Sequence, residues 1–245
     1  MKNFFAAGAS VRGASHISSN KECEDYIDFS INDNCCILAV ADGAGSAERG
    51  GAGARVAVRS VMEYMRERKY PERVNLKNMV EYARNSLAHF AILDGYDFKD
   101  YATTLIVIIS YGDRIRLIQI GDGGVVGRRK GKFQMISEPM NTEYANETVF
   151  LTSSSYMKFL RTGTFRNFDL IFAFTDGIQN GVLERKNGIY SPFVGFFEAM
   201  ESFAVEESSS LDGSREIEEM LDSQRFRNIS SDDKTFGLIH YRGEI

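Results

Sequence analysis

The sequence predicts an α+β fold in which helices cover antiparallel β-sheets. Two observations lead to this prediction. The middle of the chain holds short apolar segments separated by the Gly-containing turns YGD and KGK, a pattern typical of antiparallel hairpins rather than of βαβ crossovers. Two long segments with helical periodicity precede these hairpins, and weaker helical segments follow them.

The first elements are expected to be one buried strand and two helices. Residues 35–41 form an apolar run typical of a buried strand. A helix is predicted over residues 46–69, because apolar side chains recur near one face: Ala54, Ala57, Val58, Val61 and Met65. Asn75 can cap a second helix, whose apolar positions also recur at helical spacing: Leu76, Met79, Val80, Ala83, Leu87, Phe90 and Ala91.

The rest of the chain is predicted to be rich in strands. The hairpin strands are residues 103–110, 114–120, 124–129 and 133–137. Residues 138–166 are polar and are expected to be irregular. A strand at 168–174, helices at 192–203 and 214–221, and a last strand at 235–241 complete the order.

Length and composition favour one compact domain over residues 1–245. Hydrophobic residues make up 43% of the chain, and there are only 3 prolines and no linker-like stretch. The formal charge of −5 argues against nucleic-acid binding. The densest basic cluster flanks a predicted turn and is interpreted as a solvated hairpin tip: Arg128, Arg129, Lys130 and Lys132.

Three features predict a cytoplasmic protein without a membrane partner. No apolar stretch is long enough to span a bilayer. The apolar patch at residues 4–9 is too short for a signal peptide. Cys23, Cys35 and Cys36 form no CxxC pair, so reduced thiols are expected.

The dipeptide Asp-Gly occurs five times, at Asp42, Asp94, Asp122, Asp176 and Asp212. Asp-Gly is a common turn dipeptide, and Asp94 at a helix end and Asp212 in a polar loop fit that interpretation. The other three follow apolar strands in LAVADG, LIQIGDG and FAFTDG, so they can meet at one rim of the sheets. Clustered carboxylates need a compensating cation, and oxygen ligands favour Mg²⁺ or Mn²⁺.

Two further acidic motifs can join this rim. Glu24 and Asp25 lie in CEDY, and Asp232 and Asp233 precede the last predicted strand. The glycines after Asp42 are not followed by GK[ST], which excludes a P-loop. They are interpreted as sites of close backbone packing where a helix begins.

Six short motifs, in order along nearly the whole chain, resemble those of the PP2C-type metal-dependent protein serine/threonine phosphatases, in particular their compact bacterial branch. They are CEDY, VADGAG, YATTL, IGDG, FTDG and SDDKTFGLI. The resemblance implies a four-layer αββα sandwich, with two antiparallel sheets flanked by helices and two divalent metals at one end.

The resemblance also implies roles for individual residues. Asp42 would bridge both metals, and the carbonyl of Gly43 would bind one of them. Asp176 and Asp232 would complete the metal pair. Asp122 would face a third, weaker ion.

Asp232 is preferred to Asp233 as the ligand, because the family's metal Asp lies three residues before the motif threonine, here Thr235. Asp25 would hold a metal-bound water. Thr103 and Thr104 are expected to support the core beneath the site.

The chain departs from the family pattern at three positions. Asn20 stands where the family often has a phosphate-binding Arg, and either Lys21 or His16 is the candidate replacement. Ala44 stands where a His often follows Asp-Gly, and Asn180 where a second Asp is frequent.

The function expected from these features is hydrolysis of phosphoserine or phosphothreonine in proteins, on targets of a serine/threonine kinase. Two Mn²⁺ or Mg²⁺ ions would activate the water, so that no side-chain base is required. Two alternatives stay open at this stage. One is a two-metal phosphodiesterase or nucleotide hydrolase, and the other is a non-catalytic domain that binds a phosphorylated partner.

Overall fold

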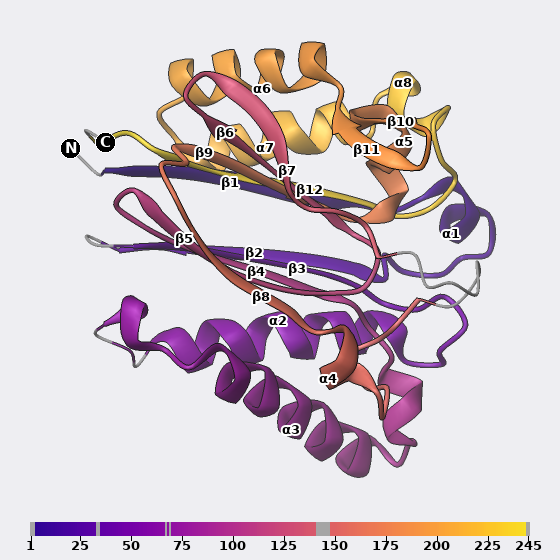
Figure 1. Cartoon of the computed structure of the whole chain (residues 1–245). Helices are drawn as coiled ribbons and strands as arrows, with labels where there is room; N and C mark the ends of the chain where they lie inside the picture. The colour runs from indigo at the N-terminus through magenta and orange to yellow at the C-terminus, as the bar shows by residue number, and fades with distance from the viewer. Residues whose placement is uncertain (1–2, 33–34, 67, 69, 141–147, 244–245) are drawn as a thin grey trace.

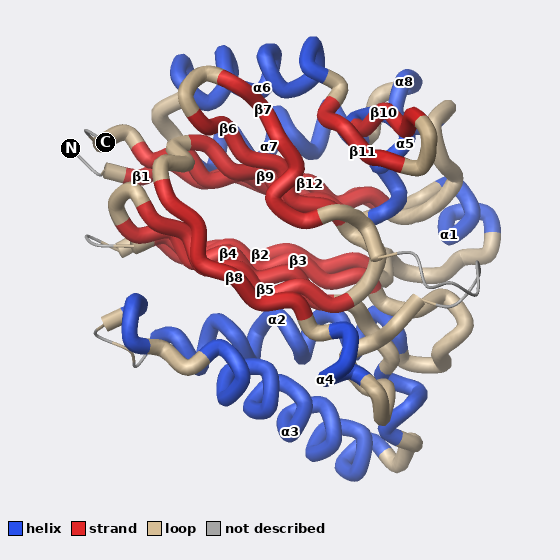
Figure 2. The backbone as a smooth tube through the Cα atoms, in the orientation of Figure 1, coloured by secondary structure: helices blue, strands red, loops and turns tan. Residues whose placement is uncertain are grey.

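The computed structural model describes residues 3–32, 35–66, 68, 70–140 and 148–243. Two five-stranded sheets lie face to face between two layers of helices (Figures 1 and 2). The predicted α+β class and the four-layer αββα sandwich are therefore confirmed.

All strand pairs within the two sheets are antiparallel. The first sheet has the order β1 (Phe4–Val11), β12 (Lys234–Tyr241), β9 (Leu170–Phe174), β6 (Gly124–Arg129) and β7 (Lys132–Ser137). The second has the order β2 (Asp25–Ile31), β3 (Cys36–Asp42), β4 (Leu105–Tyr111), β5 (Arg114–Ile120) and β8 (Arg161–Arg166).

Each sheet is covered on its outer face by one pair of long helices (Figure 1). The second sheet carries α2 (Gly50–Arg66) and α3 (Leu76–Asp94), and the first carries α6 (Val194–Glu206) and α7 (Ser210–Leu221). The predicted cap of α3 is present, since the Asn75 side chain accepts hydrogen bonds from the N–H groups of Lys77 and Asn78. Among the described residues, no helix combines the length and the apolar character that crossing a bilayer requires.

Short elements connect these layers. They are α1 (Ala14–Ser18), the 3₁₀ turns η1 (Pro71–Arg73), η2 (Phe98–Tyr101) and η3 (Asp176–Ile178), α4 (Tyr156–Phe159), α5 (Gln179–Val182), the hairpin of β10 (Leu183–Lys186) and β11 (Ile189–Pro192), and α8 (Gln224–Arg227).

The apolar run of β3 is continuous because both of its faces are buried. Ile37 and Ala39 pack toward α2 and α3, whereas Leu38 and Val40 pack between the two sheets. The strand is therefore held from two sides as far as its last residue, Asp42, which fixes where that carboxylate emerges.

The prediction that residues 138–166 are irregular was wrong for the end of that segment. Arg161–Arg166 forms the edge strand β8, paired with β5, and α4 precedes it; residues 141–147 lie outside the described part. An edge strand with mostly exposed side chains lacks the apolar signal that reveals a buried strand. Asp212 was also misplaced, because it lies in the first turn of α7 rather than in a loop.

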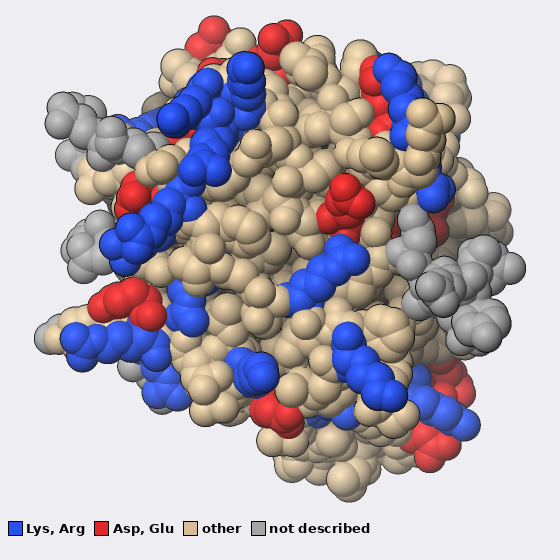
Figure 3. Space-filling view, viewed as in Figure 1, with Lys and Arg blue, Asp and Glu red and all other residues tan. Residues whose placement is uncertain are grey.

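The basic hairpin tip is where the sequence placed it. Arg129 and Lys132 pair across the β6–β7 turn, and Lys130 and Gly131 have positive φ angles. Figure 3 shows many Lys and Arg side chains toward the left of the view, at the end of the molecule away from α1. The acidic strand ends lie at the opposite end of the molecule. The last residue of β1, which leads into α1, pairs with the first residue of β12, and Asp233 comes directly before β12.

Candidate metal centre

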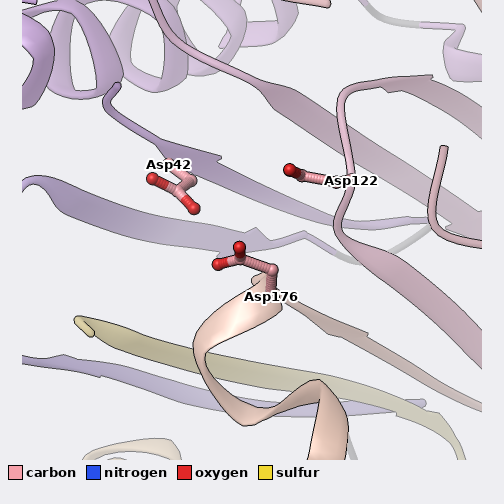
Figure 4. A group of neighbouring side chains, drawn as sticks. All are labelled: Asp42, Asp122 and Asp176. Carbon is pink, nitrogen blue, oxygen red and sulfur yellow. The ribbon is translucent and has the colours of Figure 1, made fainter. Parts of the chain in front are cut away.

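Three carboxylates from three different strand ends meet at one rim of the sandwich. Asp42 ends β3, Asp122 follows β5, and Asp176 follows β9. One carboxylate oxygen of each residue lies within 4.8 Å of those of the other two. Figure 4 shows the three side chains pointing toward one another. The structure thus brings together the three Asp-Gly motifs that follow apolar strands.

Asp25 joins this rim from the neighbouring strand. It lies directly opposite Asp42 in the β2–β3 register and is only 5% exposed. Its Oδ2 accepts hydrogen bonds from the hydroxyls of Thr175 and Thr235, both at 2.8 Å. These two threonines hold the Asp25 carboxylate in place, and the sequence analysis had given neither of them this role.

The backbone of Asp42 is fixed from beneath by Thr103 and Thr104. The Thr103 hydroxyl donates to the Asp42 carbonyl at 2.9 Å, and the Asp42 N–H donates to Thr104 Oγ1 at 2.9 Å. Both threonines are buried. They support the end of β3 that carries Asp42, as expected.

Gly43 is required by close packing against the start of α2. A Cβ at this position would lie 2.3 Å from the carbonyl carbon and oxygen of Gly50. At Gly45 the nearest atom to such a Cβ is a carboxylate oxygen of Glu24 at 3.6 Å. The Gly43 N–H also donates to the Glu24 carbonyl at 3.1 Å, so the peptide orientation after Asp42 is well determined.

Asp122 is held by two residues that the sequence analysis missed. The buried Gln119 donates from Nε2 to the carbonyl of Gly123 at 2.7 Å and lies 3.4 Å from that of Gly121, on the two sides of Asp122. The Thr148 hydroxyl donates to Asp122 Oδ2 at 2.5 Å. Gln119 had one signal in the sequence, a polar residue inside the apolar run LIQI, whereas Thr148 had none.

Asp233 does not join the cluster, because both of its oxygens are already used. Oδ1 accepts from the N–H of Gly13 at 2.6 Å, and Oδ2 accepts from the N–H of Glu24 at 2.5 Å and lies 2.8 Å from His16 Nδ1. Asp232 is exposed and lies outside the three-carboxylate group. Its Oδ1 accepts from the Asp233 N–H at 2.9 Å.

His16 and Lys21 have different surroundings. His16 lies between two carboxylates, with Nδ1 against Asp233 and Nε2 3.5 Å from Glu24 Oε2. Lys21 is half exposed, and its Nζ lies 3.4 Å from the Gly45 carbonyl and 3.8 Å from Glu24 Oε1. Lys21 therefore has an accessible charge at the rim, whereas His16 serves to join α1 to the segment before β2.

Burial and mutual repulsion disfavour the charged form of these carboxylates. Burial, followed by the charges of Asp25 and Asp176, raises the pKa of Asp42 well above its ordinary value. Burial also raises the pKa of Asp25 to about 8. For Asp176, burial and the charges of Asp122 and Asp232 raise the pKa to about 6.

The donor set fits a hard divalent cation. The converging side chains are all carboxylates, and Asp176 Oδ1 is buried without a hydrogen-bond partner among the described residues. A divalent cation would satisfy that oxygen and offset the repulsion that raises the pKa values. Oxygen-only ligation favours Mg²⁺ or Mn²⁺ over zinc.

Comparisons with known proteins found similarity over most of the chain. The family model for protein phosphatase 2C matches residues 12–222. The chain is 36% identical over 243 residues to serine/threonine-protein phosphatase 3 of Escherichia coli (strain K12), covering 94% of this chain and 95% of that protein.

Solved structures show the same fold at low sequence identity. The serine/threonine phosphatase PstP/Ppp of Mycobacterium tuberculosis matches with a TM-score of 0.68 and 15% identity, over 98% of this chain and 99% of that one. A catalytic domain of PstP in complex with two manganese ions matches with a TM-score of 0.69 and 16% identity, over 97% of each chain.

Proposed function

The chain belongs to the protein phosphatase 2C family, and we propose that it hydrolyses phosphoserine and phosphothreonine in proteins with water activated by two divalent metal ions. The observation that carries this proposal is the convergence of Asp42, Asp122 and Asp176 within 4.8 Å, with Asp25 opposite Asp42. The substrates would be proteins phosphorylated by a serine/threonine kinase.

From the family motifs that the chain carries, we propose that Asp42, the Gly43 carbonyl, Asp176 and Asp232 would hold two Mn²⁺ or Mg²⁺ ions, and that Asp122 would face a third, more weakly held ion. The related PstP catalytic domain was solved with two manganese ions, which supports this number. Asp232 is preferred to Asp233 because it is exposed, whereas both Asp233 oxygens accept hydrogen bonds from N–H groups.

The bound ions would supply Lewis acidity, which lowers the pKa of water toward neutrality and neutralises charge on the phosphoryl group. Asp25 then orients the attacking water. Its Oδ2 is fixed by Thr175 and Thr235, which leaves Oδ1 to accept a hydrogen bond from that water. With the carboxylate held in place, the water is presented in one orientation.

We propose that Lys21, and not His16, binds the substrate phosphate in place of the family's Arg. The Lys21 ammonium is half exposed, and its nearest carboxylate, Glu24, lies 3.8 Å away. His16 is held by Asp233 at 2.8 Å and is the less available of the two. Its role in our proposal is to position Glu24 and the adjoining Asp25.

We further propose that residues 1–245 fold as one domain located in the cytoplasm, without nucleic-acid or membrane partners. The two sheets share one hydrophobic cluster, which supports a single folding unit. All three cysteines are free, which supports a reducing compartment.

The test is turnover of p-nitrophenyl phosphate and of a phosphoserine peptide with Mn²⁺, compared with the same assays in EDTA and with Asp42→Asn. The proposal expects activity that requires Mn²⁺ and falls at least a thousandfold in the variant, about 4 kcal/mol of transition-state stabilisation. Asp212→Asn is the matched control. It changes the Asp of another Asp-Gly pair, which is exposed on α7 and is not one of the converging carboxylates. Undiminished turnover by Asp42→Asn would refute the two-metal assignment.

The same assay separates the two alternatives. Faster hydrolysis of cyclic dinucleotides or nucleotides than of phosphopeptides would indicate the phosphodiesterase or nucleotide hydrolase. Phosphopeptide binding without turnover or Mn²⁺ uptake would indicate a non-catalytic binding domain.

A further inference from the structure

A cavity of about 660 Å³ lies beside the candidate metal centre, between the segment before β2 and the start of α2. Its lining includes Lys21, Glu24, Arg49, Gly51 and Arg55. Glu24 connects the cavity to the centre, because it precedes Asp25 in the chain and its carbonyl accepts from the Gly43 N–H at 3.1 Å. A substrate residue that flanks the phosphoserine could therefore enter this cavity.

Arginines continue from the cavity along α2. Arg55 and Arg59 are one helical turn apart, and each guanidinium carbon lies 5.7 Å from the centre of the Tyr26 ring. Tyr26 follows Asp25 on β2, and its ring lies on the side of the sheet that carries α2. The basic strip of Arg55 and Arg59 therefore begins on that side, one residue along β2 from Asp25. Contact with the ring holds both side chains close to the surface of β2 and α2.

The charges of this strip are available to a ligand. The only carboxylate within ion-pairing distance of Arg55, among the described residues, is that of Glu22 at 3.9 Å, which is itself 91% exposed. An ion pair between two exposed side chains contributes little to stability, so Glu22 leaves the charge of Arg55 available. For the Arg59 side chain, the contact with Tyr26 is the one interaction within the described part of the chain. These arginines stand out in a chain whose formal charge is −5.

The spacing of the strip matches an extended peptide. Residues one turn apart on a helix are separated by about 6 Å along its axis. Alternate residues of an extended chain lie about 6.6 Å apart and point to the same side. Two acidic side chains at alternate positions of a substrate could therefore meet Arg55 and Arg59 together.

We infer that the basic strip of Arg55 and Arg59 selects phosphoprotein segments with acidic residues at alternate positions on one side of the phosphorylated residue. This inference rests on the proposed phosphatase function and specifies its substrate class. The acidic side chains would pair with the two guanidinium groups while the phosphate lies at the metal centre.

The experiment compares phosphoserine peptides of one length that carry glutamates at alternate positions before the phosphoserine, glutamates after it, or glutamines at the same positions. We expect kcat/KM for one glutamate peptide to exceed that for its glutamine counterpart by about tenfold at low salt, as two exposed ion pairs would give. The preference should shrink as ionic strength rises. In the double variant Arg55→Gln, Arg59→Gln it should disappear.

The control is the double variant Arg68→Gln, Arg73→Gln. The guanidinium groups of these two arginines also lie over tyrosine rings. Both residues follow the C-terminal end of α2, whereas the metal centre lies near its N-terminal end. This variant should keep the preference for the acidic peptide.

Turnover of p-nitrophenyl phosphate separates the two possible failures, because this substrate has no flanking residues. No Mn²⁺-dependent turnover by the unmodified protein would refute the phosphatase function itself. Normal turnover combined with equal kcat/KM for glutamate and glutamine peptides, or with a preference that survives in the Arg55→Gln, Arg59→Gln variant, would overturn the inference about the strip.

Discussion

Asp25 and Asp42 lie directly opposite each other at the end of the β2–β3 pair, at the rim where Asp122 and Asp176 also converge. In an antiparallel pair, side chains at such positions are close neighbours, and like charges there are destabilising. The fold thus places repulsion at one end of the sandwich, where a bound cation would relieve it.

The first prediction concerns the pH dependence of stability without metal. Burial raises the pKa of Asp25 to about 8, and burial together with the charges of Asp122 and Asp232 raises that of Asp176 to about 6. Between about pH 4 and pH 8 the folded protein therefore holds protons that the unfolded chain has released. The free energy of unfolding of the metal-free protein should fall as pH rises through this window, by on the order of a few kcal/mol.

Urea denaturation of EDTA-treated protein at pH 5 and pH 8 measures this effect. Saturating Mn²⁺ should stabilise the protein more at pH 8 than at pH 5, because the ligands must be deprotonated to bind. Metal-free stability that increases from pH 5 to pH 8 would contradict this account of the cluster.

The second prediction contrasts two nearby glycines. Gly43→Ala places a Cβ 2.3 Å from the backbone of Gly50, so the start of α2 or the end of β3 must move. We expect a loss of about 1–3 kcal/mol in the free energy of unfolding, as for other overpacked sites, together with a large loss of activity. In Gly45→Ala the new Cβ would contact only a carboxylate oxygen of Glu24, at 3.6 Å. This variant should therefore change the free energy of unfolding and the activity little. Equal behaviour of the two variants would show that the close approach is not needed.

The third prediction concerns Gln119 as a positioning residue for Asp122. Gln119→Met keeps a side chain of similar size but removes the donor that serves the carbonyls on both sides of Asp122. We expect a loss of about 1–3 kcal/mol in stability and weaker binding of the most weakly held Mn²⁺ ion, measured by titration calorimetry. Gln134→Met, at an exposed position on β7, is the control. An unchanged Mn²⁺ isotherm would exclude this role.

The fourth prediction separates Lys21 from His16. Lys21→Met should raise KM for p-nitrophenyl phosphate and lower kcat/KM by about tenfold, because it removes the proposed phosphate ligand. Stability should change little, because the ammonium group is half exposed. His16→Gln should instead lower the melting temperature, because it disturbs the contact with the buried Asp233. A variant at Lys21 with unchanged KM would leave another residue as the phosphate ligand.

The sequence sufficed to predict the α+β class, most buried strands and the convergence of the strand-end aspartates. Burial on both faces makes β3 apolar throughout, and the Asp-Gly that follows this apolar run is recognisable in the sequence. Asp94 and Asp212 carry the same dipeptide, and they were distinguished from the other three because neither follows an apolar strand.

Long-range hydrogen bonds were the part that the sequence did not reveal. Thr175 and Thr235 hold Asp25 although 150 and 210 residues separate them from it in the chain. Asp233 binds His16 over a separation of 217 residues. Such contacts follow from the packing of the two sheets, and no local pattern in the sequence encodes them.

The most direct test of the metal centre is an anomalous difference map from crystals grown with Mn²⁺. Our account predicts two strong peaks between Asp42 and Asp176, with the Gly43 carbonyl and an Asp232 oxygen within coordinating distance, and Asp233 still bonded to His16. A map without a peak beside Asp42, or with Asp232 turned away from the ions, would contradict it.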